Sequence, residues 1–488
     1  MTLASGSMRH LTLPLLILLL LTTSGPRWTK AEDADTRSAP PNVILLMADD
    51  QGWGDVGYHG HPILRTPHLD AMAAGGLRLE RFYAAAPVCS PTRGSCLTGR
   101  HPSRYGIPHA NRGHMRRGEL TLAEALRTRG YQTGHFGKWH LGTLTTDVRD
   151  SNGGGRSKFV PHHAPPWRHG FERCFSTEAK VPTWNPMVDP KKPGEQRPYG
   201  THYWNERGEI VTENLSGDDS RVIMDRVIPF VRGAAEAKRP FLAVVWFHAP
   251  HLPVVAGPRH LALYPGVVDM SHRHYYGCLS ALDEQLGRLR AELRSLGIEG
   301  DTLLWYTSDN GPETSRGRSS PGRTGPFRGR KRSLLEGGVR VPALLEWPGH
   351  IAAGRESNLP CSTSDILPTV LELVDERKNG QIEGLVRPLD GESLAPLIEG
   401  SMERRGGAIA FASNRQLALH RGRWKIYSAD GGERFALYDL DADPGEARDL
   451  SREHPSVLAG LRAELDAWRA SCAASDRGAD YRAESAPK

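Results

Sequence analysis

The chain has 488 residues, which is enough for one large α/β core with an appended domain. It is 38% apolar and 24% charged, and its 53 glycines and 36 prolines show no repeat of roughly 20 to 50 residues. This composition excludes a disordered chain, a fibre, a solenoid and a propeller. The formal net charge of +6 depends partly on the N-terminal segment.

The N-terminus has the pattern of an export signal. An apolar run of 11 residues at 11–21 follows Arg9, and small residues continue to Ala31. The run is shorter than the roughly 20 residues that span a bilayer, which favours a signal peptide at 1–31 over a membrane anchor. Its removal lowers the net charge to +3 and leaves no charge argument for nucleic-acid binding. We expect a secreted or periplasmic protein with no stable membrane insertion after cleavage.

The first predicted core elements lie between residues 42 and 136. Asn42–Ala48 (NVILLMA) is typical of a buried parallel strand, and Asp49 and Asp50 follow it directly. Acidic residues at the carboxyl end of a core strand lie where α/β sheets place their ligand sites. Residues 121–129 predict a helix, and residues 131–136 predict a short strand.

A long surface insertion is predicted at 143–208, because this segment is rich in Pro, Gly, His and Trp and lacks periodicity. Such insertions commonly carry specificity. Several of its side chains suit sugar stacking and hydroxyl recognition, and the sequence does not choose among them: Trp167, Arg168, His169, Trp184, Asn185, His202 and Trp204.

Periodicity returns with helices at 220–231 and 275–296 and strands at 240–247 and 302–306. The first of these strands leads into His248 and His251, and the second into Asp309 and Asn310. Three buried strands therefore end in polar clusters that can meet at one sheet edge.

From about residue 408 the pattern changes to short alternating strands at 416–420, 423–427 and 435–439, followed by a helix at 457–470. We expect an α/β fold with a large, mainly parallel sheet between helices at 32–400. A C-terminal α+β subdomain at 401–488 would contain a small antiparallel sheet and a helix.

Candidate metal ligands follow two of the predicted strands. Asp49, Asp50, Asp309 and Asn310 offer three carboxylates and an amide oxygen, which suit a hard divalent cation such as calcium. Seen alone, either pair is more often an ordinary loop cap or turn than a metal site.

The segment CSPTRGSCLTGR at 89–100 resembles the signature of type I, formylglycine-dependent sulfatases, C-x-P-S/T-R followed by Leu-Thr-Gly. Other family motifs occur in the family's order: Asp49-Asp50, GKWHLG at 137–142, PHLP at 250–253, SDNG at 308–311, and Lys331 five residues before an EGG triplet. LYDL at 437–440 with the later Asp-Pro pair extends the resemblance over nearly the whole mature chain. Within that family the chain resembles arylsulfatases and N-acetylgalactosamine-6-sulfatases.

The resemblance implies an alkaline-phosphatase-like fold, with a large mixed sheet, and a secreted sulfuric ester hydrolase. Its substrate would be a sulfated carbohydrate or an aryl sulfate. A formylglycine-generating maturation enzyme would oxidise Cys89 during export. One calcium ion would bind Asp49, Asp50, the modified residue 89, Asp309 and Asn310.

The resemblance also implies roles for the basic residues. Lys138, Lys331 and the metal would surround the sulfuryl group, since its oxygens otherwise repel a nucleophile. Arg93 would fix the formylglycine hydroxyls and metal ligands with its forked donors. His251 would protonate the departing alcohol, and His140 would take a proton from the second formylglycine hydroxyl.

Three further features have two interpretations each. His248 either contacts substrate together with Lys138, His251 and Lys331, or supports the loop. Cys96 fits a packed helix position better than a catalytic one. The basic stretch at 316–332 is either a solvated loop or a surface that steers an anionic polymer to the pocket; it contains Arg316, Arg318, Arg323, Arg328, Arg330, Lys331 and Arg332.

The six cysteines do not form a dense disulfide framework, and no CxxC pair predicts zinc. Two other functions are alternatives to this interpretation. A phosphodiesterase or phosphonate monoester hydrolase of the same superfamily would need ligands for a second metal ion, whereas His140 and His251 with two lysines match the one-metal sulfatase arrangement. An inactive carbohydrate-binding homologue would lack a motif residue, and none is missing. The sequence leaves open the sugar, the sulfate position, exo or endo action, disulfide pairing, the cleavage site and the oligomeric state.

Overall fold

The computed structural model describes residues 40–191, 194–314, 321–375 and 384–481, so the predicted signal peptide lies outside it. Within those ranges no helix combines the length and the apolar character that crossing a membrane requires. The main body contains a ten-stranded mixed sheet in the order β12-β2-β11-β9-β1-β8-β4-β5-β6-β7.

Five consecutive strands of this sheet, from β9 to β5, run parallel to one another. The flanking strands complete the sheet with antiparallel pairs and one further parallel pair, β12 with β2. Its strands are β1 (Asn42–Ala48), β2 (Leu77–Leu79), β4 (Gln132–Lys138), β5 (Arg173–Thr177), β6 (Tyr203–Asn205), β7 (Ile210–Val211), β8 (Phe241–Trp246), β9 (Thr302–Ser308), β11 (Ala343–Glu346) and β12 (Arg355–Ser357).

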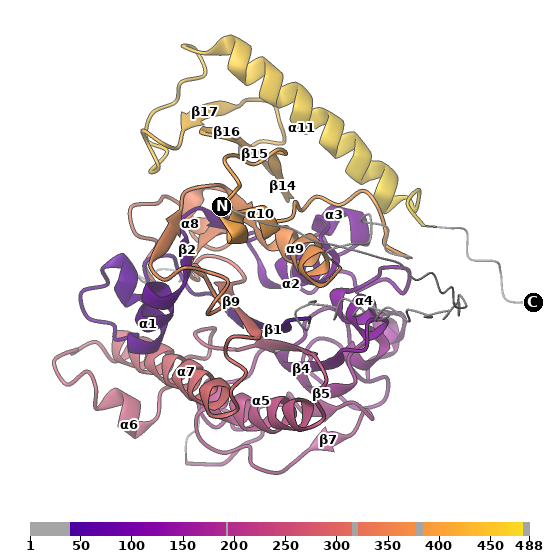
Figure 1. The fold of residues 1–488 in the computed structure, drawn as a ribbon, viewed down its shortest axis with the longest axis vertical. Coiled ribbons are helices and arrows are strands. Elements are labelled where there is room, and N and C mark those ends of the chain that lie inside the picture. Colours follow the sequence, from indigo (N-terminus) through magenta and orange to yellow (C-terminus); the bar gives the residue numbers. More distant parts are fainter. Residues whose placement is uncertain (1–39, 192–193, 315–320, 376–383, 482–488) are drawn as a thin grey trace, which may run out of the picture. The chain divides into compact units, whose positions relative to one another are not determined.

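Both faces of the large sheet are buried, which explains the continuous apolar sequence of β1. Val43, Leu45 and Met47 belong to one core, whereas Ile44 and Leu46 belong to the other. The first core is covered by α2 (Cys89–Thr98), α4 (Leu122–Arg127) and α9 (Ile366–Val374). The second is covered by α1 (Pro67–Gly75), α5 (Asp219–Glu236) and α7 (Met270–Ser295). Figure 1 shows α5 and α7 on one side of the strands and α2 and α9 on the other. The predicted α/β fold is confirmed.

Shorter elements connect these layers. A three-stranded sheet has the order β10-β3-β13. The remaining elements are β3 (Phe82–Tyr83), β10 (Arg340–Val341), β13 (Cys361–Ser362), α3 (Pro102–Tyr105), α6 (Pro258–Leu261), α8 (Glu336–Val339), α10 (Ala395–Glu399), and the 3-10 helices η1 (Gly57–His59), η2 (Ser157–His162), η3 (Pro166–Arg168) and η4 (Thr363–Asp365).

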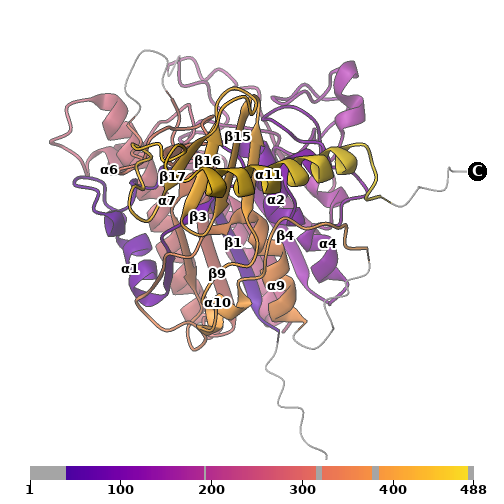
Figure 2. The ribbon, with the colours of Figure 1, turned by 90° about the horizontal axis from the view of Figure 1, so that it is seen from above.

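The C-terminal part forms a four-stranded antiparallel sheet of β14 (Ile409–Ser413), β15 (Gln416–Arg421), β16 (Trp424–Ser428) and β17 (Ala436–Asp439). The strands β15, β16 and β17 match the three predicted strands, whereas β14 was not predicted. Figure 2 shows α11 (Pro455–Asp476) lying across this sheet. Leu461 and Leu465 of α11 pack on one face, and the other face packs against Leu334 and Val339 of the main body.

The prediction that all of 143–208 lies at the surface is wrong for two strands. β5 pairs with β4 and β6 pairs with β5, and four of the five residues of β5 are buried. These strands are five and three residues long. Such short runs between Gly- and Pro-rich loops give too little periodicity to be recognised.

Candidate active site

The polar ends of three neighbouring strands meet, as the sequence predicts. β1 lies between β8 and β9, so the residues that follow these strands share one edge of the sheet. The Asp49 N–H donates to the Ala249 carbonyl (2.9 Å), and the Asp50 N–H donates to Asp309 Oδ1 (3.1 Å). Backbone hydrogen bonds therefore fix the acidic residues relative to the loop after β8 and the end of β9.

Cys89 is the first residue of α2, and Arg93 follows one turn later on the same helix. Both are buried, with 2% and 0% of their surfaces exposed. Arg93 donates to Asp309 Oδ2 from Nη2 (2.6 Å) and Nε (3.1 Å), and to the Lys138 carbonyl from Nη1 (3.2 Å). Arg93 thus joins α2 to the ends of β9 and β4, which holds Cys89 against the acidic cluster.

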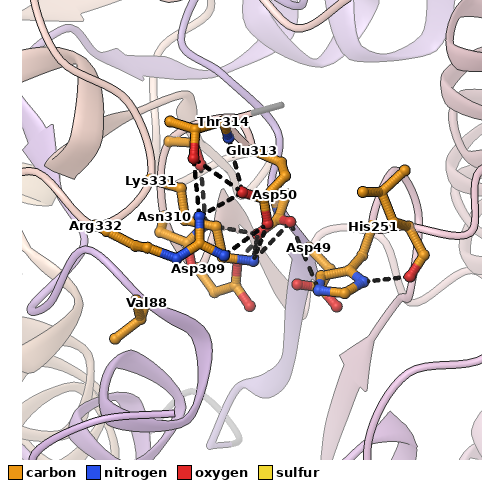
Figure 3. Close-up of polar contacts among 12 residues, drawn as sticks. Asp49, Asp50, Val88, His251, Asp309, Asn310, Glu313, Thr314, Lys331 and Arg332 are labelled. Carbon is orange, nitrogen blue, oxygen red and sulfur yellow. Dashed lines mark hydrogen bonds and ion pairs between the residues drawn. The ribbon is translucent and has the colours of Figure 1, made fainter. Parts of the chain in front are cut away.

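Two lysines pair with the two adjacent aspartates. Lys138 Nζ lies 2.6 Å from Asp49 Oδ2, and Lys331 Nζ lies 2.7 Å from both oxygens of Asp50 (Figure 3 shows the Lys331 pair). Burial alone would lower the pKa of each lysine, but the neighbouring aspartates raise it above its ordinary value. Burial likewise opposes ionisation of Asp50, but Lys331, His251 and Lys138 hold its pKa well below the usual range. Lys138, Lys331 and Asp50 therefore stay charged at neutral pH.

The donor atoms fit a hard cation. Asp49 Oδ1 and Asn310 Oδ1 are buried and have no hydrogen-bond partner among the described residues. Ligand atoms of Asp49, Asp50, Cys89 and His251 lie within 4.8 Å of one another. Burying such oxygens without a partner costs free energy that a bound cation would offset. Asp309 also borders this group, and burial together with Asp49 raises its pKa to about 6 against the opposing effect of Arg93.

The unmodified thiol of Cys89 is a poor nucleophile in this position. Burial raises its pKa to about 11, although Lys138 and Lys331 act in the opposite direction. At neutral pH the side chain is therefore a thiol and not the reactive thiolate.

His140 has one engaged and one free ring nitrogen. Its Nε2–H donates to the Asn111 side-chain oxygen (2.6 Å), while the buried Nδ1 has no partner among the described residues. Burial, Lys138 and Arg93 hold the pKa of His140 well below its ordinary value, so the ring is neutral and Nδ1 carries a lone pair. Sequence analysis missed Asn111, which lies in an irregular loop and has no motif of its own.

His251 lies at the open side of the cluster, with 13% of its side chain exposed. Its Nδ1–H donates to the Leu252 carbonyl (2.6 Å), and its Nε2 lies 3.7 Å from Asp50 Oδ2 (Figure 3). Burial lowers its pKa well below the ordinary value, with Asp50 acting in the opposite direction. Nε2 is therefore the nitrogen that faces the acidic cluster.

His248 supports the structure and does not face the cluster. It is fully buried, its Nδ1 lies 2.8 Å from Asp219 Oδ2, and its Nε2 lies 2.8 Å from Thr177 Oγ1. Because both ring nitrogens are engaged, the geometry contradicts substrate contact and favours the structural alternative. His248 and Asp219 instead join the end of β8 to α5.

The residues proposed for sugar recognition divide into two groups. Trp204 is 3% exposed and donates from Nε1 to Asp150 (2.7 Å), and His169 is 1% exposed. Neither is available for stacking on a sugar. Trp167, Arg168, Trp184, Asn185 and His202 remain at least partly exposed.

The described part of the basic stretch is held mostly by protein oxygens. Arg330 donates to the carbonyls of Glu313 (3.2 Å) and Gly322 (2.6 Å), and Arg328 donates to the Glu446 carbonyl. Lys331 points into the site, whereas Arg316 and Arg318 lie outside the described residues. A freely solvated loop is therefore the wrong description of its second half.

Two further features concern the cysteines and the glycines of two sequence motifs. Cys96 is buried in α2 as predicted, and none of the six cysteines is paired. The loop after β9 and the start of α8 meet closely, because a Cβ on Gly311 would lie 2.1 Å from the Gly337 carbonyl oxygen. This contact requires a glycine at 311, and Gly337 is required separately because a Cβ there would lie 2.4 Å from the Gly329 carbonyl oxygen.

Known proteins resemble this chain over most of its length. The Sulfatase family model matches residues 41–376. Arylsulfatase A of Bos taurus is 34% identical, with 87% of this chain and 82% of the relative covered. N-acetylgalactosamine-6-sulfatase of Sus scrofa is 32% identical, with 84% and 75% covered.

Solved structures share the fold. The crystal structure of Ps i-CgsB has a TM-score of 0.76 at 26% identity and covers 88% of this chain and 93% of its own. The phosphonate monoester hydrolase of Agrobacterium radiobacter has a TM-score of 0.59 at 22% identity, with 88% and 96% covered, and therefore shares the fold alone. With the family model and the curated relatives in agreement, this chain belongs to the sulfatase family and is a sulfuric ester hydrolase.

Proposed function

We propose that the protein is an exported sulfatase that hydrolyses sulfate esters of carbohydrates. In this proposal Cys89 is converted to formylglycine by a maturation enzyme, and one calcium ion binds at Asp49, Asp50, residue 89, Asp309 and Asn310. The observation that carries it is the buried cluster around residue 89, in which two carboxylates, two ammonium groups and two unpartnered oxygens lie together.

When present, the calcium ion supplies a fixed positive charge and the formylglycine a hydroxyl nucleophile. Lys138 and Lys331 would bind the sulfuryl oxygens from two sides of residue 89, and their charge would stabilise the negative charge that grows in the transition state. Both lysines are already fixed by aspartates, so little reorganisation is needed on binding. Arg93 would keep residue 89 oriented through its contacts with Asp309.

The two histidines suit opposite proton transfers. His251 Nε2 faces the cluster from its open side, while the Nδ1–H is held by the Leu252 carbonyl. As the acid, the ring would take up a second proton on Nε2 when the negatively charged sulfate ester binds, and this proton would pass to the departing alcohol oxygen. His140 Nδ1 has a lone pair and no partner, so it would accept a proton from residue 89. Asn111 keeps the His140 proton on Nε2 and so leaves the Nδ1 lone pair free to accept a proton.

A carbohydrate substrate is supported by the relatives. Ps i-CgsB, which is 26% identical, was solved in complex with k-i-k-neocarrahexaose, with a TM-score of 0.75. Export is supported by the sequence pattern at 1–31, which lies outside the described residues.

A desulfation screen tests the proposal. Protein co-expressed with a maturation enzyme is assayed for released sulfate on sulfated monosaccharides, animal and marine polysaccharides, and a nitrophenyl sulfate. A phosphonate monoester and a phosphodiester are included, and Cys89→Ala is the control. We expect sulfate release that Cys89→Ala abolishes. Faster cleavage of the phosphorus esters, or equal activity in Cys89→Ala, would contradict the proposal.

A further inference from the structure

Arg332 has a backbone conformation that a non-glycine residue rarely adopts. It follows Lys331 with φ +76°, and Asp50 (φ 69°) and His140 (φ 59°) share this left-handed region at the same site. Glycine would adopt it without a steric penalty. The conformation is fixed from both sides, because the Arg332 N–H donates to the Pro87 carbonyl (2.8 Å) and its carbonyl accepts from Gln416 Nε2 (2.7 Å). Strain retained beside a reaction centre points to a role for the side chain.

The Arg332 side chain is 49% exposed and shares Glu313 with Lys331 of the site. Its guanidinium donates to both oxygens of Glu313, with Nη2 at 3.0 Å, and from Nη1 to Thr314 Oγ1 (3.0 Å). The same Glu313 lies 3.4 Å from Lys331 Nζ, so one carboxylate joins the guanidinium to the lysine that binds Asp50 (Figure 3). These bonds use three of its five N–H groups and leave two for a ligand.

We propose that Arg332 binds a second anionic group of the substrate, a sulfate or a carboxylate, while the scissile sulfate occupies the site beside Lys331. The inference rests on the proposed function and narrows its substrate class to glycans that carry at least two anionic groups. A planar guanidinium fork matches the paired oxygens of either group. Glu313 holds that fork next to Lys331, the cation proposed to bind the ester.

The test compares kcat/KM for four probes: a nitrophenyl sulfate, a monosulfated disaccharide with a neutral neighbouring sugar, the same disaccharide with a second sulfate, and the same disaccharide with a uronic acid. Selectivity is the ratio of kcat/KM for a doubly anionic probe to that for the monosulfated disaccharide. Arg332→Gly should lower this ratio at least tenfold, mainly through KM, and leave Tm equal or higher because glycine relieves the strain. Arg332→Lys should give an intermediate ratio, because it keeps the charge and loses the fork.

Lys238→Gly is the matched control, since Lys238 is an exposed cation with φ 50° at the end of α5. It should leave the ratio unchanged. The proposal is overturned if Arg332→Gly keeps the wild-type ratio, or if it lowers Tm and reduces kcat equally on all four probes. The second-sulfate and uronic-acid probes show which anion is bound. If wild-type protein releases sulfate from none of the probes, the proposed function fails, and this result is distinct from an unchanged ratio.

Discussion

Lys425 is a buried cation that joins the C-terminal sheet to the segment carrying Lys331. Its Nζ lies 2.9 Å from Glu336 Oε1 and 2.7 Å from Glu446 Oε1, and all three side chains are fully buried. Glu336 begins α8, five residues after Lys331, and its N–H donates to Glu446 (2.7 Å). Lys425→Met keeps most of the side-chain volume and removes the charge.

Lys425→Met should lower the stability of the fold, because it leaves the carboxylates of Glu336 and Glu446 buried without their cation. Burial alone would raise the pKa of Glu336, but Lys425, His420 and Arg340 bring it to about 2. Removing one partner of a buried ion pair costs about 3–5 kcal/mol. Unfolding entropy is about 2.1 cal/mol/K per residue, or about 0.9 kcal/mol/K for roughly 450 residues. Lys425→Met should therefore lower Tm by about 3–5 °C.

Thermal unfolding followed by near-ultraviolet circular dichroism measures this shift. Arg448→Met is the control, because the Arg448–Glu453 pair spans a similar distance (2.9 Å) but its side chains are 70% and 50% exposed. Exposed pairs contribute about 0.2–1 kcal/mol, so Tm should fall by about 1 °C or less. Adding Glu446→Gln to Lys425→Met should recover part of the loss. Equal Tm values for Lys425→Met and Arg448→Met would refute the reasoning.

Four further predictions concern the site. Asp309→Ala should lower both the calcium content after dialysis, measured by elemental analysis, and turnover; full metal content with full turnover would argue against it. His251→Ala should slow a sugar sulfate by about 10²–10⁴-fold but a nitrophenyl sulfate far less, because a phenolate leaves without a proton; equal losses would exclude His251 as the acid. His140→Ala should instead give a burst of one equivalent of alcohol and then stop, and steady release without a burst would exclude its role in the second step. Asn111→Leu should reduce turnover about threefold to tenfold, the value of one hydrogen bond, and an unchanged rate would show that Asn111 does not orient His140.

The predictable parts of the molecule are those with a strong local pattern. Asn42–Ala48 is apolar at every position after the first, so both the strand and its burial on two faces follow from the sequence. The polar residues directly after β1 and β9 converge because parallel neighbours share a carboxyl edge. The predicted cluster of Asp49, Asp50, Asp309 and Asn310 is therefore reproduced by the geometry.

The parts that were missed depend on contacts between distant segments. His248 and His251 lie in one loop, and only Asp219 on α5 and Thr177 on β5 show that His248 is structural. Asn111 reaches His140 from a loop 29 residues earlier in the chain. Neither partner leaves a periodic or motif signal in the sequence.

The most direct test of the account relates the chemical state of residue 89 to sulfate release. Preparations with different levels of maturation enzyme are digested, and peptide mass spectrometry measures the fraction of formylglycine at residue 89 in each. The account predicts that the rate of sulfate release per protein molecule rises in proportion to that fraction and approaches zero without it. Full activity in a preparation that contains only unmodified Cys89 would contradict it.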